Sequence, residues 1–213
     1  MRRRILEPGD RAAEVLFGLI MVLTFTGSLS AAEAGRADVR AMLIGALGCN
    51  LAWGVIDGVM YLMGCLADRG RDRRTWRAVR ESKDGGEARR AVASALSPIL
   101  ASVVLPAELD TVGERLRLLP EPRAGARLGR DAWWGASAVF LLVFLSTLPV
   151  VIPFLLIGGV ARALRVSNAV ALSMLYLTGH ALGRVTGHRP WLTGLAMVAV
   201  GAVLVAITIA LGG

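Results

Sequence analysis

The sequence lacks the short motifs that many soluble enzymes carry. Its 213 residues contain no Cys-x-x-Cys pair, no His-Glu-x-x-His helix, no glycine-rich phosphate loop and no nucleophile elbow. Histidine and cysteine are scarce, with two residues of each. A catalytic site of the soluble type therefore has no support, and we predict that the protein is not an enzyme.

Charge is missing from more than half of the chain. Five runs hold 117 residues and one formal charge, Asp57; they are residues 15–32, 41–67, 132–161, 166–183 and 190–213. Such segregation excludes a soluble globule, a disordered chain and a fibrous repeat. Because a helix of 18 residues already reaches about 27 Å, we predict an all-α, polytopic membrane protein with five transmembrane helices.

The first run has an alternative interpretation as a cleaved secretory signal. Three arginines precede it and small residues follow it, so that a cleavage site would lie within residues 30–34. Glu7, Asp10 and Glu14 count against this alternative, because the beginning of a signal is basic rather than acidic.

The distribution of basic residues predicts the orientation. With a cytoplasmic N-terminus, 20 of the 24 Lys and Arg residues lie on the cytoplasmic side, as the positive-inside rule requires. An odd number of spans then places Gly213 on the far side. We expect an integral protein of a bacterial inner membrane.

We predict three segments: residues 1–67 with the first two spans, a basic cytoplasmic helical segment at 68–131, and residues 132–213 with the last three spans. The middle segment begins with a basic stretch that we expect to bind anionic inner-leaflet lipids rather than nucleic acid. Its candidate lipid-binding residues are Arg69, Arg71, Arg73, Arg74, Arg77 and Arg80. Residues 91–105 are uncharged but too short to cross a bilayer, which indicates a position at the interface or packed under the bundle.

Asp57 is the most informative residue, because an acid inside a span is costly and usually faces a bundle interior, a cavity or a partner. Helical spacing places it on one stripe with Asn50, Gly54, Gly58 and Tyr61. This stripe predicts a cation or proton path that includes Asp57, Asn50 and Tyr61. Alternatively, it is a packing face in which the two glycines allow close approach.

Soft and nitrogen ligands are sparse. Met21 and Met60 are candidate thioether ligands that could complete a metal site with Asp57, although methionine also fills apolar cores. His180 and His188 are weaker candidates, because their spacing of eight residues does not place them on one turn of a helix. Cys49 and Cys65, about 24 Å apart on one helix, cannot form a bridge within the chain.

Several stretches resemble the vacuolar iron transporter family. They are Glu14-Val-Leu-Phe-Gly18 and its continuation to Val22, Leu148-Pro-Val-Val-Ile-Pro-Phe154, and the glycine-rich residues 175–187 and 194–201. The resemblance implies five spans, a cytoplasmic segment between the second and third spans, and a homodimer. It also implies a transporter that moves a divalent cation such as iron or manganese out of the cytosol, with proton antiport as the expected coupling and no permanently bound cofactor.

This sequence departs from the family at functional positions. Met21 stands where the family has an aspartate, and residues 55–61 stand where it has Ser-Met-x-x-Gly-Glu-Tyr. With these departures, the resemblance implies metal-binding candidates at Asp57, Met21 and Met60, and an acidic cytoplasmic mouth at Asp10 and Glu14. The alternative function is a membrane-anchored interaction or scaffold protein that has lost transport.

Overall fold

The structure, a computed structural model, describes residues 8–27, 35–122 and 128–210. Every regular element in these residues is an α-helix, which confirms the all-α fold class. The helices are α1 (Pro8–Gly27), α2 (Arg36–Glu81), α3 (Gly85–Ala95), α4 (Pro98–Val103), α5 (Pro106–Leu118), α6 (Arg130–Leu156), α7 (Val160–Thr186) and α8 (Pro190–Ala210). The alternative signal-cleavage site at 30–34 and the C-terminal Gly213 lie outside the described residues.

The chain forms two compact units. Unit 1 comprises Met1–Tyr61 and Trp133–Gly213, and unit 2 comprises Leu62–Ala132. The border predicted after residue 67 falls inside α2, which contributes to both units. This helix continues beyond the apolar run because no proline interrupts it before Glu81.

Within residues 8–27, 35–122 and 128–210, three helices are long and apolar enough to cross a membrane. They lie at Ala37–Glu81, Arg130–Leu156 and Pro190–Ile207, which match three of the five predicted spans. Helix α1 begins with Asp10, Arg11 and Glu14, and α7 has arginines near both ends. These charges shorten their uninterrupted apolar lengths, and the count of five spans and their orientation remain predictions.

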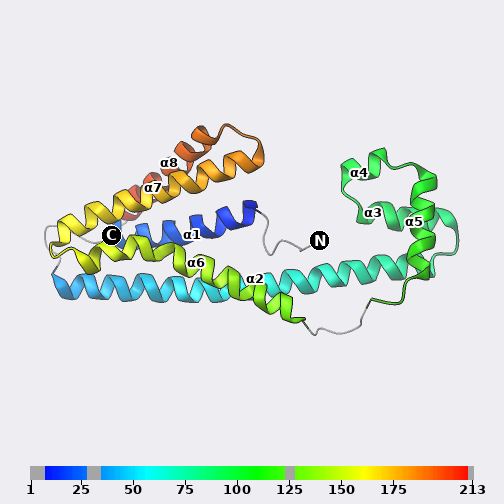
Figure 1. Cartoon of the computed structure of the whole chain (residues 1–213), viewed down its shortest axis with the longest axis horizontal. Helices are drawn as coiled ribbons and strands as arrows, with labels where there is room; N and C mark the ends of the chain where they lie inside the picture. Colours follow the sequence, from blue (N-terminus) through cyan, green and yellow to red (C-terminus); the bar gives the residue numbers. More distant parts are fainter. Residues whose placement is uncertain (1–7, 28–34, 123–127, 211–213) are drawn as a thin grey trace. The chain divides into compact units, whose positions relative to one another are not determined.

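Helix α1 contributes the centre of the core of unit 1. Leu19, Val22 and Leu23 are buried, and they cluster with Val150 of α6 and with Ala171 and Leu175 of α7. Figure 1 shows α1 in blue beside α6 and α7. Helix α1, whose first turns are acidic, therefore packs its later apolar side chains against α6 and α7.

Glycines bring α7 and α8 into close contact. A Cβ atom on Gly179 would lie 2.7 Å from the carbonyl oxygen of Thr193 and 3.0 Å from the Cα of Gly194. Helix α7 ends at Gly187, whose φ of 73° gives the left-handed conformation that glycine adopts without strain. The two helices then form an antiparallel hairpin (Figure 1).

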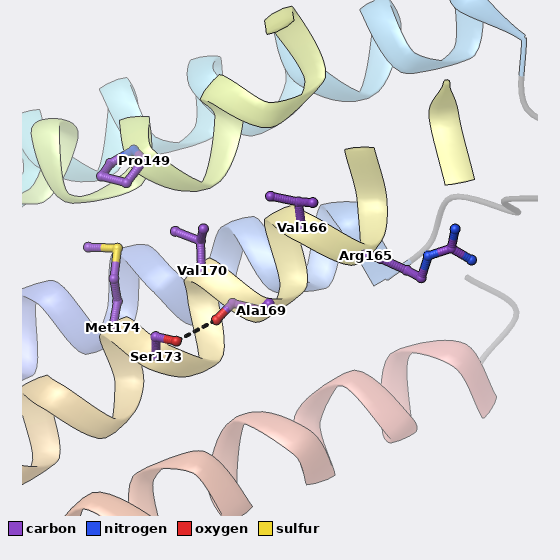
Figure 2. A pocket seen from close by; sticks show the side chains of 7 residues that line it. All are labelled: Pro149, Arg165, Val166, Ala169, Val170, Ser173 and Met174. Atoms are coloured by element: carbon purple, nitrogen blue, oxygen red, sulfur yellow. Dashed lines mark hydrogen bonds between the residues drawn. The ribbon is translucent and has the colours of Figure 1, made fainter. Parts of the chain in front are cut away.

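Helix α6 contains two prolines in its interior, Pro149 and Pro153. Close to them, the Ser167 hydroxyl of α7 donates a hydrogen bond of 2.7 Å to the Val150 carbonyl. A groove of about 620 Å³ lies beside Pro149, and its other lining residues come from α7. Figure 2 shows Pro149 facing Val170 and Met174 across this groove. The turn of α6 that contains Pro149 therefore faces α7. This is expected for a membrane helix in which proline leaves a carbonyl group without its usual N–H donor.

Unit 2 has a small core of its own. Val79 of α2 is fully buried against Ala88 and Val92 of α3 and Leu109 of α5. Asp84 caps α3 by accepting a hydrogen bond of 2.7 Å from the Glu87 backbone N–H. Thus part of the uncharged 91–105 stretch packs inside this unit.

Candidate functional site

The predicted polar stripe lies on the buried face of α2. Four of its residues are buried, namely Asn50, Gly54, Asp57 and Gly58, and the fifth, Tyr61, is half-buried. The other side of the helix exposes apolar side chains, among them Leu51, Val55, Val59 and Met60. Polar residues inside and apolar residues outside are the arrangement expected when lipid, rather than water, surrounds a helix.

The two glycines of the stripe allow α6 to approach α2 closely. A Cβ on Gly54 would lie 3.2 Å from the carbonyl oxygen of Phe140, and one on Gly58 would lie 3.3 Å from that of Ala136. Tyr61 packs its ring over Gly135 in the same way. These contacts support a packing role for this part of the stripe.

Asp57 itself meets an acid from another helix. Its carboxyl group lies close to that of Glu14 on α1. Two ionised carboxylates at close range repel each other, so this arrangement favours a proton on one of them. Asp57 is only 8% exposed, and Oε2 of Glu14 and Oδ2 of Asp57 are buried without a protein partner.

Two further polar atoms near this face of α2 lack partners. The Asn50 side chain donates to the Ala46 carbonyl at 3.0 Å, but its Oδ1 has no donor. The Nε1 of Trp53 is also buried and unpartnered, while its ring contacts Phe17 edge to face at a centroid distance of 6.4 Å. Trp53 was not among the predicted site residues, although its position four residues before Asp57 would have placed it beside the stripe.

These unpartnered atoms are spread along α2. Asn50 and Asp57 are two helical turns apart, about 10 Å along the axis, so one ion cannot touch both. Buried polar atoms without partners are rare in native structures and need an explanation such as water or a bound ion. The arrangement is therefore suited to successive positions for a proton, a water or a cation.

The other predicted ligands lie less close to Asp57. Asp10 is exposed one turn before Glu14 and acts on it electrostatically. Met21 is half-buried two turns after Glu14, and Met60 is 61% exposed on the apolar side of α2. Within the described residues, no three His, Cys, Asp or Glu side chains form a group that could hold a metal ion.

The histidines and cysteines do not enlarge this site. His180 packs against Tyr176 with a ring-centroid distance of 5.9 Å, and its buried Nδ1 has no partner. His188 is exposed and lies 3.1 Å from the Thr186 hydroxyl. Both cysteines are free thiols.

In unit 2, two of the predicted lipid-binding arginines share the same acidic partner. Arg73 and Arg77 both contact Oε1 of Glu121, at 2.7 and 3.1 Å. Hydrogen bonds from Arg73 and then Arg77 hold the pKa of Glu121 below its ordinary value. The sequence could not indicate this, since 44 and 48 residues separate the partners.

The other four arginines differ in their surroundings. Arg80 lies over the Trp76 ring at 4.9 Å, and the Trp76 indole donates to the Leu119 carbonyl at 3.1 Å. Arg71 forms an ion pair with Asp68. Arg69 and Arg74 are exposed. The stretch predicted to bind lipid therefore also supports the internal structure of unit 2.

Comparison with known protein families is informative at this point. The sequence profile of the VIT family matches residues 73–213. The chain belongs to the VIT family. This is the vacuolar iron transporter family that the sequence resembles, and its members are transporters rather than enzymes. No curated protein matches the chain.

Membership of the VIT family, together with the apolar helices, identifies a membrane protein and indicates metal ion transport. The matched residues include α3 to α8 and the end of α2. They do not include Glu14 or Asp57. The significance of this carboxyl pair therefore depends on its geometry in this chain.

Proposed function

We propose that this VIT family protein moves a divalent cation such as iron or manganese out of the cytosol in exchange for protons. Five spans, a cytoplasmic N-terminus, a bacterial inner membrane and a homodimer belong to the same proposal. The observation that supports it most strongly is the Glu14–Asp57 pair, two carboxyl groups from different helices that lie close together and each keep a buried oxygen without a protein partner.

The chemistry of the pair links cation binding to proton release. Carboxylates bind a metal ion in their deprotonated form, so a cation arriving at Glu14 and Asp57 would displace a proton held there. When a proton returns, it competes with the cation for the same oxygens. Mutual exclusion of a proton and a cation at one pair of side chains is the coupling that exchange transport requires.

Neighbouring residues extend this site into a path. Asp10, exposed one turn before Glu14, would attract cations at the cytoplasmic mouth. On the other side of the pair, Asn50 offers an unpartnered oxygen two turns along α2. Met21 lies two turns after Glu14 on α1 and would be a later thioether contact. Met60 would contribute only if α2 turned its exposed face toward the path.

The scaffold alternative is favoured by one set of contacts. Gly54, Gly58 and Tyr61 pack closely on α6, as in a helix interface without a conducting role. In that case the contact between Glu14 and Asp57 would serve only to join α1 and α2.

Flux measurements in proteoliposomes distinguish the two functions. We expect Fe²⁺ or Mn²⁺ flux in the wild type and its loss in Asp57→Asn and Glu14→Gln, which keep side-chain size but remove an ionisable oxygen. Asp72→Asn is the matched control, because Asp72 is an exposed aspartate on the same helix. Unchanged flux in Asp57→Asn would remove this residue from the mechanism, and absence of flux for every divalent cation tested would contradict transport.

A further inference from the structure

Helix α4 is a hydrophobic helix that buries nothing. It has six residues, Pro98-Ile-Leu-Ala-Ser-Val103, and none of them is buried. Ile99 is 78% exposed, Leu100 52% and Val103 69%, and Leu105, just after the helix, is 63% exposed. No charged residue occurs between Arg90 and Glu108. A helix that is apolar on every side requires an apolar environment around it.

The segment is held in place at both ends. Leu96 and Val104, which flank α4, pack against the core that contains Val79 and Val92. The apolar side chains between them consequently project from a fixed base. Their exposure is not a consequence of a poorly packed unit.

The hydrogen-bonding groups of α4 are satisfied locally. Ser97 caps the helix by accepting from the Leu100 N–H at 3.4 Å, and Ser102 donates to the Ile99 carbonyl at 2.8 Å. Pro98 and Pro106 have no N–H to satisfy. A segment with few free donors can leave water without a large desolvation cost, which is a requirement for entering lipid.

The size of α4 makes another protein a poor partner. Six residues of helix are about 9 Å long, whereas a stable protein interface covers about 800 Å² on each partner. A bilayer has no such minimum area, and it surrounds an inserted helix on several sides. A membrane is available to unit 2, because α2 includes a candidate membrane-spanning segment and continues without interruption into this unit.

The surrounding charge fits an anionic membrane surface. Residues 68–131 contain fourteen of the 24 Lys and Arg residues, and Arg90 is exposed close to the start of the uncharged stretch. We propose that α4, with Leu105, inserts into the anionic leaflet of the membrane that the same chain spans. This inference extends the expected interfacial position of residues 91–105 by assigning insertion to α4, and it is independent of transport.

Insertion is testable with an environment-sensitive fluorophore on the full-length protein. Cys49 and Cys65 are replaced by alanine, and a single cysteine is placed at Ile99→Cys or, as a control, at the exposed Thr111→Cys on α5. Each labelled protein is reconstituted singly into nanodiscs of phosphatidylcholine and phosphatidylglycerol, with or without lipid that carries a spin-label quencher in its acyl chain. We expect a blue-shifted emission and strong quenching at position 99, and water-like emission with little quenching at 111.

Other outcomes would overturn the proposal. Water-like emission at 99, with quenching equal to that at 111, would show that α4 stays in solution. Shielding at 99 that appears only when two chains share a nanodisc, without quenching by the lipid, would assign α4 to a contact between copies. In a second variant pair, Ile99→Asp should abolish the quenching of a label at Val103→Cys, whereas Thr111→Asp should leave it unchanged.

Discussion

The two compact units differ in the burial and pairing of their polar side chains. In unit 1, Asn50 and Asp57 are buried and Glu14 is half-buried, and each keeps a buried oxygen without a protein partner. In unit 2, acids such as Asp110 and Glu121 lie near the surface and are paired with arginines. Packing also differs, because unit 1 combines an apolar core with close glycine contacts between helices, whereas unit 2 has a small apolar core.

This difference indicates where function lies. An exposed ion pair contributes little to stability. Its carboxylate is already paired with a basic side chain. Buried carboxyl oxygens without partners are costly, and a protein retains them when a proton, a water or an ion uses them. The difference between the units therefore supports our proposal that ion chemistry takes place in unit 1, with a supporting role for the charges of unit 2.

The largest effect on stability is expected in the core of unit 2. Leu109→Ala removes a buried side chain from a small cluster and should cost about 2–5 kcal/mol. Because the two units have separate cores, hydrogen exchange should accelerate in α3 and α5 but not in α7 and α8. Leu118→Ala, at a position that is 86% exposed, is the control and should change neither. Faster exchange throughout the bundle would show that the units do not unfold separately.

A smaller effect is expected at the α7–α8 contact in unit 1. In Gly179→Ala, the new methyl group meets backbone atoms that cannot move aside, so the helices must separate, at a cost of about 1–3 kcal/mol. Gly48→Ala, where nothing lies within 4 Å, should instead be neutral or slightly stabilising. Thermal unfolding in detergent measures both variants. Equal unfolding temperatures would contradict the role assigned to close packing.

The smallest effect is expected from the surface ion pairs of unit 2. Arg73 and Arg77 lower the pKa of Glu121 from its ordinary value of 4.5, so their stabilisation is present at neutral pH. It is lost as the pH falls from that ordinary value through the lowered one. Fluorine NMR of fluorotryptophan at Trp76, which bonds to Leu119 nearby, should report this acid transition. Glu121→Gln should weaken it and Glu114→Gln should not; identical titrations in both would indicate that the pairs have no effect.

Much of the fold could be predicted from the distribution of charge. The runs at 41–67, 132–161 and 190–213 correspond to helices that can cross a membrane, because apolar length alone determines that property. The extension of α2 to Glu81 was not predicted, because the apolar run ends at residue 67. Residues that favour helix continue beyond that run as far as the Gly85-Gly86 break, so the helix is longer than its apolar part. Chemical pattern therefore indicated the spans better than the limits of the helices.

The site was predictable within one helix and not between helices. Spacings of three and four residues correctly placed Asn50 and Asp57 on the same buried face of α2. Spacing says nothing about which helix packs against that face, so the contact of Asp57 with Glu14 could not be derived. Met60 lies three residues after Asp57, just beyond the edge of the stripe, which explains its exposure.

The central claim is that Glu14 and Asp57 exchange a proton for a divalent cation. The most direct measurement follows Mn²⁺ uptake and internal pH together in proteoliposomes, with cation-sensitive and pH-sensitive dyes inside. We predict that Mn²⁺ and protons move in opposite directions in the wild type, and that both movements are lost in Asp57→Asn but kept in Asp72→Asn. Mn²⁺ uptake that continues in Asp57→Asn, with unchanged proton movement, would contradict the claim.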